Sequence, residues 1–427
     1  MEIYVVKSGD SLYQIAQRFG VSEERIISDN DLDASASLVP GQTLVILYPL
    51  RTHTVQNGET LESIANQYGV TINQLLRNNP QLAGQMTIYP GQTLTIDYDQ
   101  EKQGVMSVNG YAYPYIDRDV LRKTLPYLTY LTLFTYGFTP EGELIDMEDE
   151  ELIRLAREYG VAPLMLISTL TEDGTFSNEL ASLVLNNLEL QSRLIDRILE
   201  TLRTRNYYGL DVDFEFIRPE DRVAFVAFIR NITTRLNAEG YQVITALAPK
   251  TATDQPGLLY EGHDYQGIGA ASNYVLLMTY EWGYTYGPPM AVAPINKVEE
   301  VLQYAVTQIP PEKIFMGIPN YGYNWTLPFV RGESQAQSLS NVAAVDLARE
   351  AGAYIQYDTV AQAPHFNYYD EQWREHEVWF EDARSIQAKL ALVPQYGFNG
   401  VSYWNIMRYF PQNWLVLNSL YDIRKVL

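Results

Sequence analysis

Eight short apolar segments, separated by longer amphipathic ones, follow one another from about Gln100 to the end of the chain. Short apolar runs bounded by turn residues predict buried strands, and helices between consecutive strands predict parallel pairing. The expected strands are Val105–Ala112, Tyr130–Thr135, Ala162–Ile167, Gly209–Phe216, Gln242–Leu247, Tyr274–Tyr280, Ile314–Pro319 and Gly400–Trp404. Eight parallel strands close a barrel with helices outside. The pattern therefore predicts an α/β fold of the (β/α)8 TIM-barrel type.

The segments between the strands fit this fold. Met147–Tyr159 reads as a helix ended by Gly160, and Pro219–Glu239 as a helix that opens on a proline and is ended by Gly240. One stretch, residues 323–382, is too long for a simple connection and has its own helix and aromatic strand-like pieces. We expect a small α+β insertion there, which forms one wall of a groove.

The fourth expected strand reads Gly-Leu-Asp-Val-Asp-Phe-Glu-Phe. Because strand side chains alternate between faces, Asp211, Asp213 and Glu215 are expected on one face. Carboxyl groups this close cannot all ionise at neutral pH, so one keeps a proton and can serve as a general acid. A metal site would require further oxygen ligands nearby, and a solvated acidic strand is the third interpretation. We expect a catalytic acid site without metal or cofactor.

The first hundred residues contain one pattern twice. Val-Lys-Ser-Gly-Asp-Ser-Leu at 6–12 matches Val-Gln-Asn-Gly-Glu-Thr-Leu at 55–61, and the Pro-Gly-Gln-Thr-Leu at 40–44 recurs at 90–94. Each copy predicts a strand, a turn, a helix capped by Ser or Thr, a second helix and a closing strand. We therefore expect two βααβ domains, at 1–49 and 50–99, before a barrel domain at 100–427.

This repeat closely resembles the LysM module. The resemblance implies that each copy binds glycans containing N-acetylglucosamine through the loop after its first strand and the loop before its last. The matching positions are Gly9, Asp10, Ser11, Asn30, Asp31 and Leu32 in the first copy, and Gly58, Glu59, Thr60, Asn79, Pro80 and Gln81 in the second. Turns and helix caps are the ordinary use of such residues, so a structural role for each stays open.

Four segments of the barrel resemble the family-18 glycoside hydrolases, the chitinase-like family. They are the Asp-x-Asp-x-Glu of the fourth strand, Met278-x-Tyr280 on the sixth, Gly317-Ile318-Pro319-x-Tyr321-Gly322 on the seventh and Trp404 at the end of the eighth. With two LysM modules in front, the whole chain is similar to the spore cortical fragment-lytic enzymes of endospore-forming bacteria. That group acts as N-acetylglucosaminidases during germination.

The resemblance implies a role for each acid. Glu215 would protonate the glycosidic oxygen, while the acetamido oxygen of the substrate itself attacks the anomeric carbon. Asp213 would orient the acetamido N–H, and Asp211 behind it would tune the proton balance.

Further sugar contacts are expected from Tyr280, Trp404, Glu281 and Tyr321, with core packing as the alternative for Tyr280 and Trp404. The chain departs from the common family pattern at Tyr208 and Glu281, where aspartate is usual, and at residues 168–170, which read Ser-Thr-Leu in place of Ser-x-Gly-Gly. These departures leave the acid in place.

Charge and composition limit the classes of molecule that the chain is expected to bind. A formal net charge of -22 disfavours nucleic acid and anionic membranes, and no segment of about 18 apolar residues is present. The first residues, Met1–Lys7, lack the pattern of a signal peptide. We expect a monomer that acts on peptidoglycan glycan strands in the bacterial spore, at the boundary of coat and cortex, and that is made in the mother cell without a signal peptide.

Two classes of function stay open. One is a retaining glycosidase that cleaves N-acetylglucosamine β-1,4 linkages in spore cortex peptidoglycan, or a chitinase. The other is a non-catalytic spore coat protein that binds peptidoglycan or chitin, and Glu215 argues against it because inactive barrels of the family typically lack the acid. The chain has no Gly-x-Ser-x-Gly and no His-Glu-x-x-His motif, and its histidines, His53, His263, His365 and His376, lie far apart. We expect each of them to be an ordinary loop or surface residue.

Overall fold

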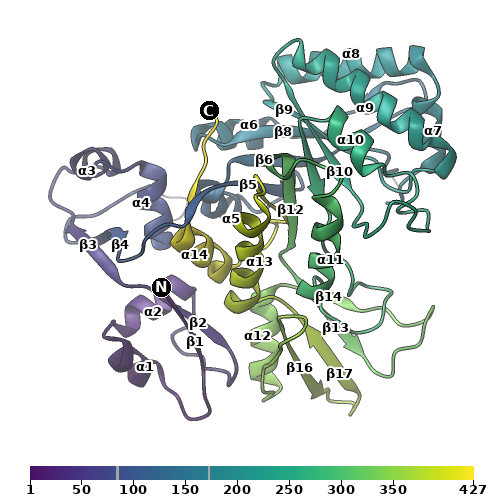
Figure 1. Ribbon diagram of the computed structural model, residues 1–427. Coiled ribbons are helices and arrows are strands. Elements are labelled where there is room, and N and C mark those ends of the chain that lie inside the picture. The colour runs from purple at the N-terminus through teal and green to yellow at the C-terminus, as the bar shows by residue number, and fades with distance from the viewer. Residues whose placement is uncertain (83–85, 172–173) are drawn as a thin grey trace.

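A closed barrel of parallel strands forms the centre of the computed structural model, which describes residues 1–82, 86–171 and 174–427 (Figure 1). In the order in which they pair, its eight strands within these residues are β5 (Gly104–Ala112), β6 (Tyr130–Phe138), β8 (Ala162–Ser168), β9 (Gly209–Asp213), β10 (Gln242–Leu247), β11 (Tyr274–Leu277), β12 (Ile314–Pro319) and β18 (Gly400–Trp404). Strand β18 pairs with β5 and closes the circle. The predicted TIM barrel is confirmed.

Helices cover the outside of the barrel. They are α5 (Arg118–Thr124), η2 (Leu125–Tyr127), α6 (Glu150–Glu158), α7 (Asn178–Leu185), α8 (Leu188–Thr204), η3 (Pro219–Asp221), α9 (Arg222–Asn237), α10 (Tyr265–Ala271), α11 (Ile295–Ala305), η4 (Pro311–Lys313), α13 (Ala383–Tyr396) and α14 (Pro411–Leu420). The short strand β7 (Leu144–Ile145) pairs antiparallel with β6, and β19 (Tyr421–Ile423) pairs in parallel with β5. On the outer face, the rings of Phe225 and Phe228 stack on Phe214. These buried ring contacts pack α9 against the residue that directly follows β9.

Two expected strands are shorter than the sequence pattern indicated. Strand β9 ends at Asp213 and β11 at Leu277, so Glu215 and Tyr280 lie in the loops that follow. Both loops turn through a residue with left-handed backbone, Phe216 (φ 55°) and Glu281 (φ 67°). Such conformations are uncommon for residues with a Cβ and end the strand alternation. Strand pairing therefore ends before Glu215, but Asp213 still lies close enough for its charge to raise the pKa of Glu215.

The stretch from Gly322 to Trp379 is the expected α+β insertion. It consists of β13 (Gly322–Thr326), β14 (Gln337–Leu339), α12 (Asn341–Glu350), β15 (Gln356–Asp358), β16 (Ala363–Tyr369) and β17 (Glu375–Trp379). The strands form an antiparallel sheet in the order β14-β13-β17-β16-β15. Helix α12 packs on this sheet through Ala344 and Ala348, in a small core that also holds Val39 of the first N-terminal domain.

The two N-terminal domains have the βααβ arrangement that the repeat predicts. The first consists of β1 (Glu2–Val5), α1 (Leu12–Phe19), α2 (Glu23–Asn30) and β2 (Thr43–Ile46); the second of β3 (Pro49–Thr54), α3 (Leu61–Tyr68), α4 (Ile72–Asn78), η1 (Pro80–Leu82) and β4 (Thr93–Tyr98). Ser11 and Thr60 cap the first helix of each domain, as expected.

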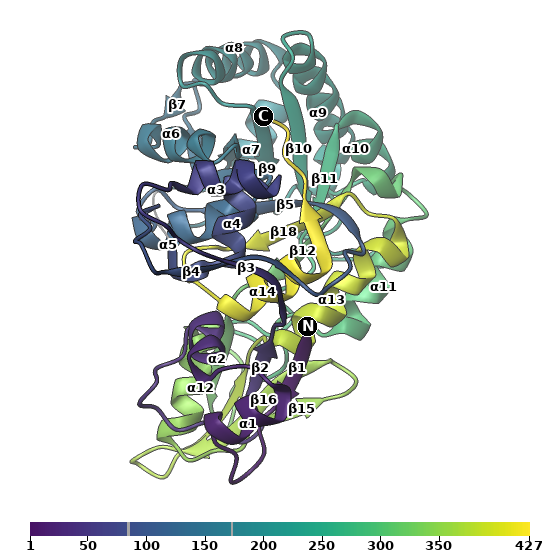
Figure 2. The ribbon, with the colours of Figure 1, turned by 90° about the vertical axis from the view of Figure 1, so that its left-hand side faces the viewer.

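The first N-terminal domain has a small core of its own, whereas the second has no core separate from the barrel, although the polar stretch 97–104 between them is typical of a linker. Buried residues of the second domain, such as Leu75, belong to the same hydrophobic cluster as the barrel. Buried Arg77 donates hydrogen bonds to Asn418 Oδ1 (3.0 Å) and to the carbonyl oxygen of Pro126 (3.1 Å). Figure 2 shows the second domain in front of the barrel and the first beside the insertion. Because a buried arginine needs hydrogen-bond partners, Arg77 ties the second domain to the barrel.

Within the described residues, no helix is both long enough and apolar enough to cross a membrane.

Candidate active site

Glu215 lies half-buried two residues beyond the end of β9, on a loop that is fixed from behind. The backbone N–H of Ala248 donates to Nδ1 of His263 (2.9 Å), so the proton is on Nε2, which donates to the carbonyl oxygen of Phe214 (3.1 Å). Burial lowers the pKa of His263 to about 4, which keeps the ring neutral. The peptide that precedes Glu215 is thereby held in place.

His263 lies in a loop, as expected, but it is fully buried, whereas His376 is buried in strand β17, so its expected place in a loop or on the surface is wrong. A single histidine in a loop carries no sequence signal of this role, because its partners, Ala248 and Phe214, are distant in sequence. The loop is also tightly packed, since a Cβ at Gly262 would lie 2.4 Å from the carbonyl oxygen of Ile217.

Asp211 and Asp213 project into the barrel below this loop. The hydroxyl of Tyr111, on β5 across the barrel, donates to Asp211 Oδ2 (2.5 Å). Oδ1 of Asp211 and Oδ1 of Asp213 are buried and have no hydrogen-bond partner in the protein. A buried carboxylate without partners is costly, so these oxygens are available to a proton or to a donor on a ligand.

Burial changes the ionisation of all three acids. It raises the pKa of Asp211 to about 8 and that of Asp213 to about 7. It also raises the pKa of Glu215 well above its usual range, and the charges of Asp213 and Glu281 raise it further. This shift favours the protonated form of Glu215, which a general acid requires.

Aromatic residues surround the acids. The ring of Trp404 makes edge contacts with Tyr111 and Phe134, with ring centroids 5.6 and 5.0 Å apart. Tyr280 is buried and packs on Gly317, where a Cβ would lie 2.7 Å from its ring. The structure thus places Tyr280 and Trp404 near the acids, where each is packed on one side by the core.

A groove with a volume of about 370 Å³ opens beside Trp404. Tyr321 and Glu281 line it together with residues that the sequence did not single out: Tyr113, Tyr115, Asn320, Tyr323, Ser338, Asn405, Met407 and Arg408. Tyr323 and Ser338 belong to the insertion, which therefore forms one wall of the groove. Tyr115 is 75% exposed and stacks on Tyr113, a platform of the kind that suits the face of a sugar ring.

Glu281 connects the groove to the acids. Its carboxylate accepts hydrogen bonds from the hydroxyls of Tyr321 and Tyr323, the second at 3.1 Å. Desolvation raises the pKa of Glu281, and its charge in turn raises the pKa of Glu215. Glu281 is thus placed to keep the acid protonated as well as to contact a ligand.

We predict that Glu281→Gln moves the alkaline limb of the pH–kcat/KM profile to lower pH. A negative charge near Glu215 favours its protonated form, so removing that charge lowers the pKa of Glu215 and the acid is lost at lower pH. The measurement is initial rates on a soluble fragment from about pH 5 to about pH 9. Glu220→Gln, which changes an exposed carboxyl in η3, is the control. An unchanged limb in Glu281→Gln would contradict this electrostatic role.

The structure also places the expected glycan-binding positions of the two small domains. Gly9 and Gly58 make turns with φ of 88° and 86°. Asp10 accepts from the backbone N–H of Lys7 (2.7 Å), and Glu59 likewise from Gln56 (2.7 Å), so both acids support the same turn. These loops and the caps Ser11 and Thr60 lie at the surface.

The second loop of each domain is different. The side chains of Asn30 and Asn79 are buried and join the helix to the closing strand; Asn30 Nδ2, for example, donates to the carbonyl oxygen of Val45 (2.9 Å). Four expected contacts from both domains, Asp31, Leu32, Pro80 and Gln81, line one hollow with Lys123 and Tyr409 of the barrel domain. The asparagines are fully used within the protein, and the glycan role of the other positions stays a prediction.

No group of three or more histidine, aspartate or glutamate side chains that could hold a metal ion occurs in the part of the chain that the structure describes.

Comparison with known proteins assigns the parts of the chain. Residues 115–408 match the model of glycosyl hydrolases family 18, and residues 4–47 and 53–97 each match the LysM domain. The chain is 39% identical to the cortical fragment-lytic enzymes of Bacillus anthracis and of Bacillus subtilis (strain 168), over 100% of this chain and 99% of each relative. Among solved structures, the spore cortex-lytic enzyme SleL of Bacillus cereus aligns with a TM-score of 0.85 at 40% identity, covering 99% of this chain and 98% of that one.

Proposed function

We propose, from the premise that this chain belongs to glycosyl hydrolases family 18 and carries two LysM domains, that it cleaves N-acetylglucosamine β-1,4 linkages in spore cortex peptidoglycan fragments. The observation that carries the proposal is the state of Glu215. It is a carboxyl group at the mouth of the barrel, and burial together with the neighbouring charges of Asp213 and Glu281 raises its pKa well above the usual range. Such a group can protonate a glycosidic oxygen.

In the proposed mechanism, Glu215 gives its proton to the leaving oxygen while the acetamido oxygen of the substrate attacks the anomeric carbon. Asp213 accepts the acetamido N–H through Oδ1, which has no partner in the protein. This hydrogen bond turns the acetamido group toward the anomeric carbon and balances the positive charge of the oxazolinium intermediate. Glu215, now ionised, then removes a proton from the water that opens the intermediate.

Two neighbours complete this arrangement. Asp211, which Tyr111 holds by a hydrogen bond, lies next to Asp213 and can take up or release a proton as the charge of Asp213 changes. The pKa values of about 8 and about 7 for Asp211 and Asp213 support such an exchange near neutral pH. Tyr280 donates its hydroxyl to the acetamido oxygen, and Trp404 packs under the sugar ring.

The cortex is proposed as the substrate because the full-length relatives from Bacillus anthracis and Bacillus subtilis named above are described as cortical fragment-lytic enzymes. The LysM domains would hold the glycan strand while the barrel cleaves it, since two weak sites on one body gain from a high effective concentration. We propose that the protein acts as a monomer at the boundary of spore coat and cortex.

Mass spectrometry of digestion products tests the choice of substrate. Purified cortex fragments, chitin oligomers and vegetative wall are incubated with the enzyme in parallel. The proposal requires the fastest release of products with N-acetylglucosamine at the new reducing end from cortex fragments. Faster cleavage of chitin would make the protein a chitinase, and no cleavage of any of the three would favour a binding protein.

The stereochemistry of the same reaction tests the mechanism. The acetamido oxygen first displaces the leaving group at the anomeric carbon, and water then displaces the acetamido oxygen. Each displacement inverts the configuration, so we predict that the first product has the β configuration. Proton NMR spectra recorded before mutarotation measure this. An initial excess of the α anomer would contradict the roles proposed for Asp213 and Tyr280, because it indicates direct attack by water.

A further inference from the structure

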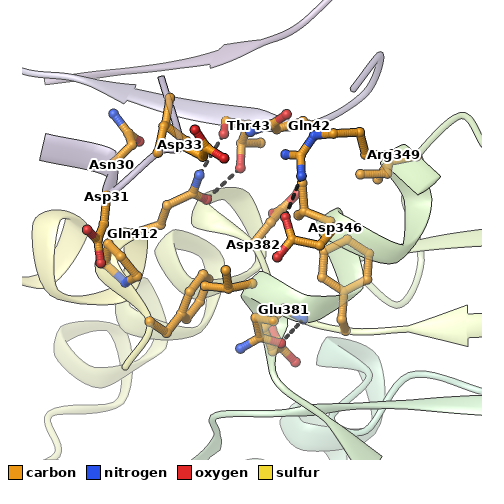
Figure 3. Close-up of a pocket in the computed structure, with 18 residues that line it drawn as sticks. Asn30, Asp31, Asp33, Gln42, Thr43, Asp346, Arg349, Glu381, Asp382 and Gln412 are labelled. Carbon is orange, nitrogen blue, oxygen red and sulfur yellow. Dashed lines mark hydrogen bonds and ion pairs between the residues drawn. The ribbon is translucent and has the colours of Figure 1, made fainter. Parts of the chain in front are cut away.

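Arg408 is the one cation among the described residues that line the groove beside Trp404. It lies in the turn after β18, and its side chain is exposed. In a chain with 52 acidic and 30 basic side chains, an arginine readily finds an acidic partner, as Arg349 does with Asp346 at the cavity beside the first LysM domain (Figure 3). Within the part of the chain that the structure describes, the guanidinium group of Arg408 makes no ion pair and no hydrogen bond.

The backbone that carries Arg408 is fixed to the neighbouring strand. Asn320, directly after β12, is buried, and its Nδ2 donates to the carbonyl oxygens of Asn405 and of Arg408 itself, each at 2.9 Å. The backbone N–H of Asn320 donates to the carbonyl oxygen of Trp404 (3.0 Å). The turn also closes on itself, since the N–H of Met407 donates to Asn405 Oδ1 (3.2 Å). Arg408 therefore starts from a fixed point beside Trp404, while its side chain is free to meet a ligand.

The groove has little other charge. Glu281 is the second charged residue of its described lining, and the hydroxyls of Tyr321 and Tyr323 already donate to its carboxylate. The protein as a whole has a formal net charge of -22, so most of its surface repels anions. An anionic group of a ligand is thus favoured at Arg408. The planar fork of a guanidinium group matches a carboxylate, which it can hold by two parallel hydrogen bonds.

The chemistry of peptidoglycan supplies a carboxylate at this distance along the strand. N-acetylglucosamine alternates with a muramyl sugar, which carries a lactyl ether that ends in a carboxyl group. If N-acetylglucosamine packs on Trp404, the next sugar along the groove is muramyl. Its carboxylate is either the free lactyl group or belongs to a stem peptide attached there. In muramic lactam the lactyl carboxyl is closed into an uncharged ring amide, and chitin has no such group.

We propose that Arg408 binds a carboxylate on the muramyl sugar next to the N-acetylglucosamine on Trp404, and that it thereby selects acidic muramyl sugars over muramic lactam and chitin. The proposal rests on the proposed function in its choice of polymer. The exposed ring of Tyr115, in the same groove, offers a face to the sugar itself, so Arg408 affects the choice of sugar more than the stacking. Because Arg408 is exposed, the preference is modest, about threefold to tenfold.

Kinetics on matched soluble fragments test the preference. Three fragments of equal length have muramyl sugars that are peptide-free, peptide-bearing or in the lactam form, and a chitin oligomer is the fourth substrate. In Arg408→Gln, we expect the ratio of kcat/KM for the preferred acidic fragment to that for the lactam fragment to fall about threefold to tenfold, mainly through KM. Arg408→Lys keeps the charge without the fork, so it should retain part of the preference. Arg230→Gln removes the same charge from an exposed position of α9 and should keep the native ratio.

NMR of the full chain with isotope-labelled arginine reports the contact itself. The Nε–H signal of Arg408 is assigned by its loss in Arg408→Lys, and the Glu215→Gln background keeps the fragments intact. We expect a saturable shift with an acidic fragment and at most a small one with the lactam fragment. A shift with the peptide-free fragment assigns the lactyl carboxylate, and a shift with the peptide-bearing fragment alone assigns the stem peptide. Because each Nε–H reports its own surroundings, binding of a fragment to the LysM domains does not interfere.

Three results would overturn the proposal: no shift with either acidic fragment, an equal shift with the lactam fragment, or an unchanged ratio in Arg408→Gln. An equal loss of activity on all four substrates would overturn it too, because it indicates that Arg408 supports the groove without reading charge. Hydrolysis of the fragments separates the two proposals. Hydrolysis by the native chain without the Arg408 shift contradicts this proposal alone, and the shift without hydrolysis contradicts the proposed function alone.

Discussion

Glu215→Gln is expected to lower the turnover of cortex fragments by at least about a hundredfold, the range found when a general acid is removed. Glutamine has the shape of the protonated acid but cannot give up a proton to the glycosidic oxygen. Because the raised pKa favours the neutral form of Glu215, the substitution changes little charge in the resting site, and substrate affinity should be kept. The measurements are kcat from product release and the dissociation constant from binding of an intact fragment.

The control for this substitution is Glu220→Gln, which changes an exposed carboxyl five positions away and should leave kcat unchanged. A second check is the pH profile, since the alkaline limb assigned to Glu215 should vanish from whatever activity remains. If Glu215→Gln hydrolyses fragments at a near-native rate, another group supplies the proton and the proposed mechanism is wrong.

The sequence was sufficient for the barrel, because apolar strands and amphipathic helices alternate over most of the chain. It was less accurate at the ends of strands. The alternation of Asp211, Asp213 and Glu215 reads as one strand, yet the backbone leaves the sheet at Asp213 and turns through Phe216. Side-chain spacing alone cannot reveal where a backbone turns when the residues of the turn also have strand-forming side chains.

The pattern of apolar and polar residues does not predict contacts between segments that are far apart in sequence. Nothing near His263 indicates that its ring holds the peptide before Glu215, because the partner, Phe214, lies 49 positions earlier in the chain. The partners of Glu281, Tyr321 and Tyr323, become adjacent only when the insertion folds over the barrel. The sequence thus indicated which residue types carry the chemistry, while the packing that orients them depends on the fold.

The same limit applies to the N-terminal domains, whose sequence repeat suggested independent modules. Each LysM copy has its own capped helices and closing strand, and these local signals are present in the structure. The interface between the second LysM domain and the barrel depends on individual residues that the repeat pattern does not mark. Arg77, for example, reads as an ordinary surface arginine of a helix, but it is 7% exposed, and its partners lie in the barrel domain.

Removal of residues 1–99 is therefore expected to destabilise the barrel rather than only to weaken its attachment to peptidoglycan. The deletion would expose η2, where Leu125 and Tyr127 are now almost completely buried, and would leave Asn418 without Arg77. Exposing large apolar side chains and buried polar groups together costs several kcal/mol. We expect the remaining chain, residues 100–427, to melt at least about 10 °C lower or to aggregate, whereas the full chain unfolds in a single transition.

A point substitution makes this expectation quantitative without removing a domain. Arg77→Ala leaves Asn418 Oδ1 and the carbonyl oxygen of Pro126 without their donor, so we expect a loss of about 3 kcal/mol in the free energy of unfolding. Arg18→Ala, at an exposed position of the first domain, should change it by less than about 0.5 kcal/mol. Thermal and denaturant unfolding of the three proteins measures this. A stable, fully active chain of residues 100–427 would contradict the shared core, and only then would the deletion separate glycan attachment from hydrolysis.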